Sequence, residues 1–105
     1  AAVLAQAKRG LHLINISRGE IVEDTALLAA IDTGKVSAAT LDVTAPEPLP
    51  AAHPFYGHPR IRLTPHISWM SEDNADRLAE KLHANLDRFL AGEALEDLIP
   101  QGRGY

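Results

Sequence analysis

Cysteine is absent from the 105 residues, which excludes disulfide bonds and thiolate metal sites and fits a reducing cytoplasm. No apolar run approaches the roughly 18 residues of a membrane-spanning helix, and no charged-then-apolar leader opens the chain. Positive charge is also scarce, since the formal net charge is -4 and no basic cluster occurs. We therefore expect a cytoplasmic protein that binds neither nucleic acid nor a membrane.

A glycine-rich phosphate-binding loop is lacking too. The seven glycines are scattered singly, and none belongs to a G-x-G-x-x-G pattern. The first residue is alanine rather than methionine, and the chain opens inside an expected helix. We therefore interpret the sequence as the later part of a longer protein.

Hydrophobic periodicity predicts strands that alternate with helices. Short apolar runs predict strands, the first of them buried. Apolar residues spaced by three and four predict helices, with Asp24 or Thr25 as a cap and Gly34 and Gly92 as stops. The expected strands cover residues 11–16, 37–43 and 61–63, and the expected helices cover residues 1–8, 24–33 and 71–90.

Two stretches carry no such periodicity. Residues 44–60 hold five of the seven prolines, so we expect an irregular loop that Phe55 and Tyr56 anchor to the core. Residues 93–105 are polar, and we expect a loosely held tail.

The order of elements predicts an α/β fold. Strands joined by helices form right-handed units, and hence a parallel sheet. Three parallel strands are about half of a dinucleotide-binding domain. We therefore expect the C-terminal half of a Rossmann-like parallel-sheet domain, followed by a long C-terminal helix.

An arginine, a glutamate and a histidine follow the three expected strands in turn. Arg18 offers a planar fork that matches a carboxylate and favours a developing oxyanion. A neighbouring carboxylate such as Glu47 favours the charged form of His66, which could then donate a proton as a general acid. Asp42, at the end of the middle strand, could accept a hydrogen bond from an amide. The set fits hydride transfer to a 2-oxo acid.

Each of these residues taken alone also has a structural interpretation. Arg18 could close a strand–helix turn, Glu47 could be a solvated loop charge, and His66 could be a satisfied half-buried histidine. Their order at successive strand ends favours catalysis, because such edges collect perturbed acids and bases. His53 and His58 suggest a metal site, but no carboxylate stands at ligand spacing, so we expect no metal.

Four ordered motifs resemble the D-isomer-specific 2-hydroxyacid dehydrogenases, and the resemblance runs along the whole chain. The motifs are Asn15-Ile16-Ser17-Arg18-Gly19, Ile21-Val22-Glu23-Asp24, residues 37–43 with Glu47-Pro48, and Leu63-Thr64-Pro65-His66. The loop 47–60 and the terminal Gly102-Arg103-Gly104-Tyr105 are similar to the glyoxylate/hydroxypyruvate reductase A branch.

This resemblance implies a role for each matching residue. Arg18 would bind the substrate carboxylate and carbonyl, Glu47 would support the imidazolium of His66, and His66 would be the proton donor. The cofactor contacts would be Ile16, Arg18, Asp42 and Ser68, and the cofactor would be NAD or NADP, with NADP slightly favoured. Ser68-Trp69-Met70 is bulkier than the family's usual small residues, which would reshape the pocket.

The resemblance also implies how the chain is organised. Residues 1–70 would be the second half of the nucleotide-binding domain, and residues 71–105 would return toward a substrate domain outside this chain. The intact parent would be a homodimer that reduces glyoxylate, hydroxypyruvate or a similar small 2-oxo acid. The 105 residues alone would be inactive and would oligomerise through an open sheet edge. The alternative is a catalytically inactive interaction or dimerisation module with the same fold.

Overall fold

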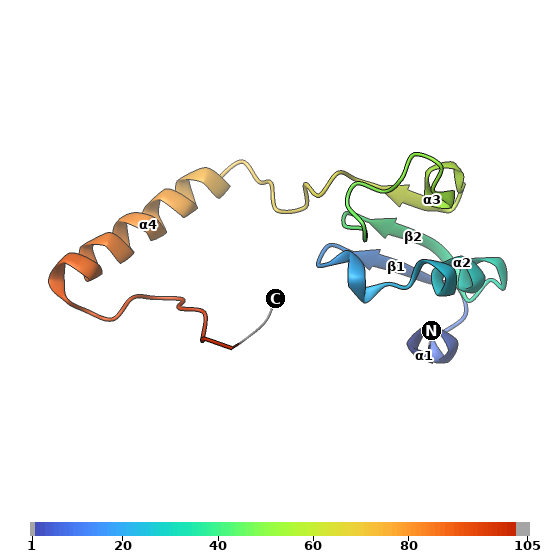
Figure 1. The fold of residues 1–105 in the computed structure, drawn as a ribbon, viewed down its shortest axis with the longest axis horizontal. Helices are drawn as coiled ribbons and strands as arrows, with labels where there is room; N and C mark the ends of the chain where they lie inside the picture. Colours follow the sequence, from blue (N-terminus) through green and yellow to red (C-terminus); the bar gives the residue numbers. More distant parts are fainter. Residues whose placement is uncertain (1, 103–105) are drawn as a thin grey trace. The chain divides into compact units, whose positions relative to one another are not determined.

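The computed structural model describes residues 2–102 and divides them into two compact units, one ending at Ser68 and the other beginning at Trp69. Ala1 and the residues Arg103, Gly104 and Tyr105 of the terminal motif lie outside the described part. Figure 1 follows the elements along the chain. They are α1 (Ala2–Gln6), β1 (Leu11–Asn15), η1 (Gly19–Ile21), α2 (Asp24–Asp32), β2 (Val36–Leu41), α3 (Pro54–Gly57), β3 (Ile61–Leu63) and α4 (Asn74–Ala91).

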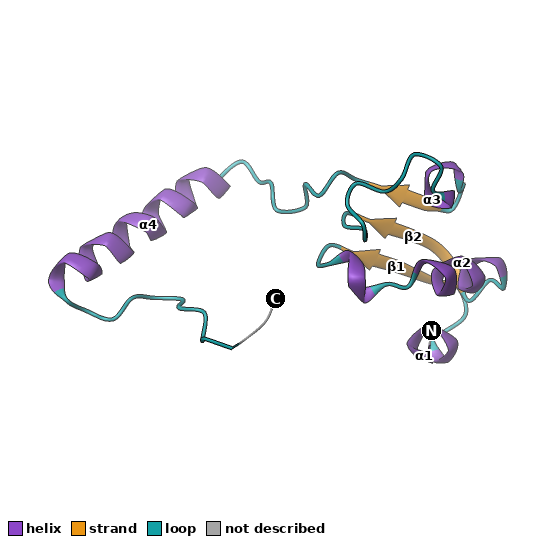
Figure 2. Ribbon diagram, in the orientation of Figure 1, coloured by secondary structure: helices purple, strands orange, loops and turns teal. Residues whose placement is uncertain are grey.

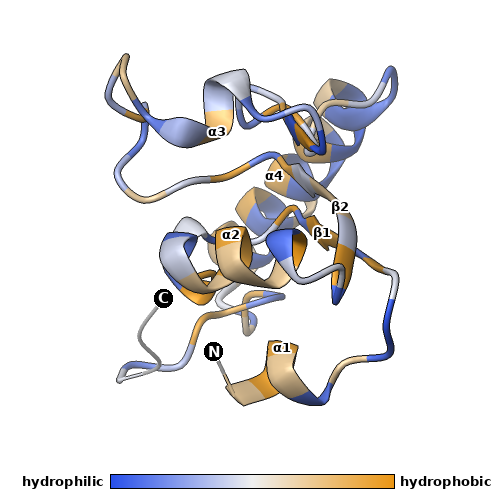
Figure 3. Ribbon diagram, turned by 90° about the vertical axis from the view of Figure 1, so that its right-hand side faces the viewer, coloured by the Kyte–Doolittle hydropathy of each residue, from blue (hydrophilic) through white to orange (hydrophobic). Residues whose placement is uncertain are grey.

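The first unit is built on a parallel three-stranded sheet in the order β1-β2-β3 (Figure 2). The expected strands and their parallel arrangement are therefore confirmed. The mostly apolar helix α2 packs on β2 (Figure 3). The core consists of side chains from α2, the strands and the following loop, the largest being Phe55, Leu27, Ile31, Leu41 and Val36.

The prediction that the first strand is buried is wrong. β1 lies at one edge of the sheet, where β2 is its only strand partner in the described chain. Ile14 and the following Ile16 are each about three-fifths exposed, at 64% and 61%. The apolar pattern of β1 is typical of a strand that is covered on both faces of the sheet. Within residues 2–102, however, β1 is covered on only one face and along only one edge.

The proline-rich segment contains a short helix, α3, that was expected to be irregular. Pro54 stands at the start of α3, where a missing N–H costs nothing. The Nδ1 atom of His53 accepts a hydrogen bond from the backbone N–H of Phe55. Phe55 is buried as predicted, but Tyr56 is 55% exposed and is held through its hydroxyl, which donates to the carbonyl of Leu49 at 3.1 Å.

The second unit begins at Trp69 and contains α4 and the segments on either side of it. α4 ends as predicted at Gly92, which adopts the left-handed conformation with φ 71°. The tail is held more firmly than expected. Asn85 exchanges two hydrogen bonds with the backbone of Glu96, and Arg88 contacts the carboxylates of Glu93 and Glu96.

Candidate active site

The three candidate residues follow β1, β2 and β3 at the same edge of the sheet. Parallel pairing places the carboxyl ends of these strands together, which is where open α/β sheets bind ligands. Arg18 comes three residues after the end of β1, Glu47 lies in the loop after β2, and His66 lies in the turn after β3. All three stand in the first unit.

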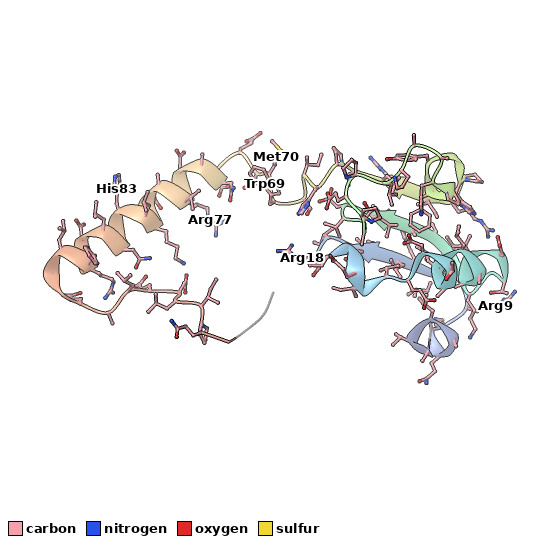
Figure 4. All side chains as sticks on the ribbon, viewed as in Figure 1. Arg9, Arg18, Trp69, Met70, Arg77 and His83 are labelled. Carbon is pink, nitrogen blue, oxygen red and sulfur yellow. The ribbon has the colours of Figure 1, made fainter. Side chains whose placement is uncertain are left out.

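The turn that carries Arg18 is shaped by Asn15. This buried side chain donates from its amide to the carbonyl of Arg18 at 2.8 Å and accepts from the N–H of Ser17 at 3.2 Å. The guanidinium group of Arg18 donates to the carbonyl of Ser17 at 2.8 Å, and its side chain projects from the loop after β1 (Figure 4). Arg18 is therefore exposed, with its remaining donors available at the edge of the sheet.

Gly19 ties the Arg18 turn to the loop that carries Glu47. A Cβ atom placed on Gly19 would overlap the backbone carbonyl of Thr44 and lie 2.5 Å from the nitrogen of Ala45. Only a residue without a side chain allows these two backbone segments to approach so closely. The sequence Ser17-Arg18-Gly19 thus fixes where the Glu47 loop begins.

Glu47 and His66 form an ion pair. The Nδ1 atom of His66 lies 3.1 Å from one carboxylate oxygen of Glu47 and 3.3 Å from the other. Both side chains are about two-fifths exposed. The contact with the Glu47 carboxylate through Nδ1 orients the imidazole ring of His66.

Asp42 is buried and makes its hydrogen bonds inside the chain. Its carboxylate accepts from the hydroxyl of Thr64, from the N–H of Ile67 at 3.0 Å and from the N–H of Ser68 at 2.8 Å. The Thr64 hydroxyl above all, and then the Ser68 hydroxyl and the two N–H groups, hold the pKa of Asp42 far below its ordinary value despite burial. The carboxylate is therefore ionised at neutral pH.

A pocket of about 300 Å³ lies beside Asp42 and Glu47. Its wall is otherwise mostly apolar, a combination typical of sites for small organic molecules. The lining residues are Asp42, Thr44, Glu47, Pro48, Leu49, Tyr56, Leu63, Thr64 and Pro65.

The structure brings together only some of the residues singled out in the sequence. Glu47 pairs with His66, and Asp42 bonds to the N–H of Ser68, whereas the guanidinium of Arg18 bonds within its own turn. The positioning role of Asn15 was missed. The available signal was a polar residue at the end of an apolar strand, the same signal that singled out Asp42.

The histidines of the proline-rich loop serve structural contacts. His53 pairs with Asp24 at 3.2 Å, and Nδ1 of His58 accepts from the N–H of Arg60 at 3.2 Å. Residues 2–102 contain no group of three His, Asp or Glu side chains placed to share a metal ion. No helix in this range has both the length and the apolar character needed to cross a membrane.

Comparison with known proteins defines the class. Residues 1–68 match the family model described as the NAD-binding domain of D-isomer-specific 2-hydroxyacid dehydrogenases. The chain belongs to this family.

Among curated relatives, the chain is 39% identical over 104 residues to a glyoxylate/hydroxypyruvate reductase A from Yersinia enterocolitica, covering 99% of this chain and 33% of that protein. A similar relative from Serratia proteamaculans is 38% identical, with 98% and 32% covered. The chain thus spans about a third of the length of these relatives.

Solved structures give the same family. A D-isomer-specific 2-hydroxyacid dehydrogenase from Xanthobacter autotrophicus, in complex with NADPH and MES, superposes with a TM-score of 0.85 at 35% identity, covering 97% of this chain and 41% of that one. An NADPH-dependent glyoxylate/hydroxypyruvate reductase from Sinorhizobium meliloti, in complex with NADP and sulfate, has a TM-score of 0.77 at 29% identity, with 90% and 29% covered. The expected fold class is confirmed.

Proposed function

We propose that the protein to which this chain belongs reduces glyoxylate, hydroxypyruvate or a similar small 2-oxo acid to the 2-hydroxy acid with a nicotinamide cofactor. The observation that carries the proposal is the ion pair between Glu47 and His66 at the carboxyl edge of the sheet. The family match and the reductase relatives support it.

His66 is the proposed general acid. When the cofactor is bound, it supplies the hydride that the carbonyl carbon receives, and the carbonyl oxygen takes its proton from His66. Glu47 is proposed to hold the imidazole in place through Nδ1 and to support the imidazolium. Arg18 is proposed to bind the substrate carboxylate and to stabilise negative charge that develops on the carbonyl oxygen, for which its exposed fork is suited.

The cofactor contacts proposed here concern only the nicotinamide end. The residues are Ile16, Arg18, Asp42 and Ser68, which stand one to five residues after the carboxyl ends of β1, β2 and β3. The exposed Ile16 side chain and the apolar pocket wall fit a planar ring. The phosphate groups would need a glycine-rich turn, a feature outside these 105 residues. NADP is favoured over NAD because related structures contain NADPH or NADP.

The organisation of the parent is proposed in the same terms. Residues 1–70 complete its nucleotide-binding domain, and residues 71–105 return toward the substrate domain. The apolar stripe of α4, with Leu82 and Phe89 about two-thirds exposed at 67% and 69%, supports a covering partner there. A homodimeric, cytoplasmic parent stays a prediction, as does the inactivity of the isolated 105 residues.

A second candidate function is an inactive interaction module with the same fold. The edge strand β1 and its exposed Ile14 favour it, because an unpaired edge invites strand addition. The isolated 105 residues would then oligomerise. Reductase activity of the parent distinguishes the two ideas: turnover supports the enzyme, and a stable assembly without turnover supports the module.

Steady-state reduction of glyoxylate and hydroxypyruvate by the parent tests the enzyme directly. His66→Ala should lower kcat by roughly 10²–10⁴-fold, the usual contribution of a general acid. Glu47→Gln should lower kcat, since the imidazole of His66 loses the carboxylate that orients it. His83→Ala, on exposed α4, is the matched control. Unchanged turnover in His66→Ala rules out the mechanism, and an unchanged kcat in Glu47→Gln removes Glu47 from it.

A further inference from the structure

Most of the acceptor sites of the Asp42 carboxylate are engaged with one short segment. A carboxylate offers about four lone-pair sites. The Thr64 hydroxyl and the N–H of Ile67 both bond to Oδ1, and the N–H of Ser68 bonds to Oδ2. The Ser68 hydroxyl also interacts favourably with this carboxylate. The acceptor capacity of Asp42 is thus used within residues 64–68, which leaves little for a ligand amide.

The segment that Asp42 holds contains His66 in an unusual backbone conformation. The φ angle of His66 is 53°, in the left-handed region that residues with a side chain rarely adopt. Its N–H donates to the carbonyl of Thr64 at 3.0 Å, which closes a tight turn. A residue stays in such a conformation only where its surroundings over-determine it. The bonds from Asp42 to Thr64, Ile67 and Ser68 lie on both sides of His66 and meet that requirement.

We propose that Asp42 is a positioning residue that clamps the 64–68 turn and so aims the imidazole of His66 at Glu47 and the substrate. This role of Asp42, which acts through the turn, takes the place of the direct cofactor contact proposed above for Asp42. The consequence for catalysis rests on the proposed function, in which His66 is the proton donor. The clamp itself rests only on geometry.

Four variants of the intact protein separate the clamp from a direct cofactor contact. Asp42→Asn keeps the size of the side chain but replaces one acceptor oxygen with a donor. Thr64→Val removes the hydroxyl donor while keeping the shape, and Thr64→Ser restores a hydroxyl. Asp32→Asn is the matched control, because Asp32 is an exposed acid at the end of α2 that lies 4.0 Å from Arg60.

The first readout is hydrogen–deuterium exchange of the peptide that contains Ile67 and Ser68, measured by mass spectrometry without cofactor. Asp42→Asn and Thr64→Val should speed exchange there by about 10-fold or more, as expected when a hydrogen bond to a charged acceptor is lost. Thr64→Ser and Asp32→Asn should leave it unchanged. If Asp42→Asn does not fold, the contrast between Thr64→Val and Thr64→Ser decides the outcome.

The second readout is the split between kcat and the cofactor KM in the parent. The clamp predicts that Thr64→Val and Asp42→Asn both lower kcat, by up to about 10²-fold, because the general acid His66 is misplaced. The cofactor KM should stay nearly constant. A raised cofactor KM in Asp42→Asn alone, with unchanged exchange, overturns the proposal and makes Asp42 a cofactor ligand. Faster exchange in a protein without reductase activity supports the clamp and refutes only the proposed function.

Discussion

Gly19→Ala tests whether the Arg18 turn and the Glu47 loop are held together as the structure has them. The new Cβ would lie 2.5 Å from the nitrogen of Ala45 and closer still to the carbonyl of Thr44. Ordinary van der Waals contact begins at 3.4 Å, so the two backbone segments must separate by about 0.9 Å or more (3.4 minus 2.5). Because the opposing atoms are backbone, no side-chain rotation can relieve the overlap.

The energetic cost of this overlap can be estimated from the usual effect of adding a methyl group to a packed site. Inserting a methyl group into a packed site typically costs about 1–3 kcal/mol. For a unit of this size each kcal/mol lowers Tm by roughly 4–8 °C. In the parent, a shift of the Glu47 loop by nearly 1 Å should also reduce kcat, because a misplacement of about that size can cost roughly 10²-fold.

Thermal unfolding followed by circular dichroism measures the effect, with Gly57→Ala as the matched control. A Cβ on Gly57 would meet nothing within 4 Å, so the same chemical change is harmless there. It should be neutral or slightly stabilising, because alanine restricts the unfolded chain. If Gly19→Ala has the same Tm as Gly57→Ala and the wild type, the close approach of the two loops is refuted.

Three further predictions concern charge and capping. The folded state holds the pKa of Asp42 below its ordinary 3.8 and so binds fewer protons than the unfolded state. The free energy of unfolding of the wild type should therefore fall from about pH 5 downward, and Asp42→Asn should flatten this slope. An equal slope for the two proteins in urea titrations at about pH 3–6 would contradict this. Arg18→Lys should recover only part of the kcat/KM that Arg18→Ala loses in the parent, because lysine lacks the planar fork; full recovery would refute bidentate binding. His53→Ala should cost about 1–2 kcal/mol through the lost α3 cap, whereas Asp24→Asn, which breaks only a partly exposed ion pair, should cost less than about 1 kcal/mol in thermal melts.

Local patterns in the sequence were sufficient to predict the sheet and the pairing of two site residues. Glu47 and His66 follow neighbouring strands, and parallel topology brings the ends of such strands to the same edge, which agrees with their observed contact. The catalytic roles of these residues stay predictions. The helix stop at Gly92 was predicted for the same kind of reason, since a glycine after a periodic segment marks the left-handed cap.

The network around Asp42 was beyond what local patterns predict. Its partners lie 22–26 positions further along the chain and meet it only because His66 turns the backbone through the left-handed region. Residues 64–68 contain no glycine, the usual occupant of that region, so no residue type marked the turn. α3 was missed for a related reason, because proline reads as a helix breaker except at the first helical position.

The exposed apolar residues of the chain share one physical cause. Periodicity correctly identified the stripe of α4, yet Leu82, Leu86 and Phe89 are between half and about two-thirds exposed, and Ile14 on β1 is equally uncovered. A helix of 18 residues gains most of its stability from a covered apolar face, and a strand at the centre of a Rossmann sheet gains it from two neighbours. The polar contacts from the tail to Asn85 and Arg88 do not cover the apolar face of α4, and they give β1 no second neighbouring strand. The apolar pattern of both elements is therefore typical of a protein interior, which supports the proposal that the Arg18, Glu47 and His66 edge acts within a longer parent protein.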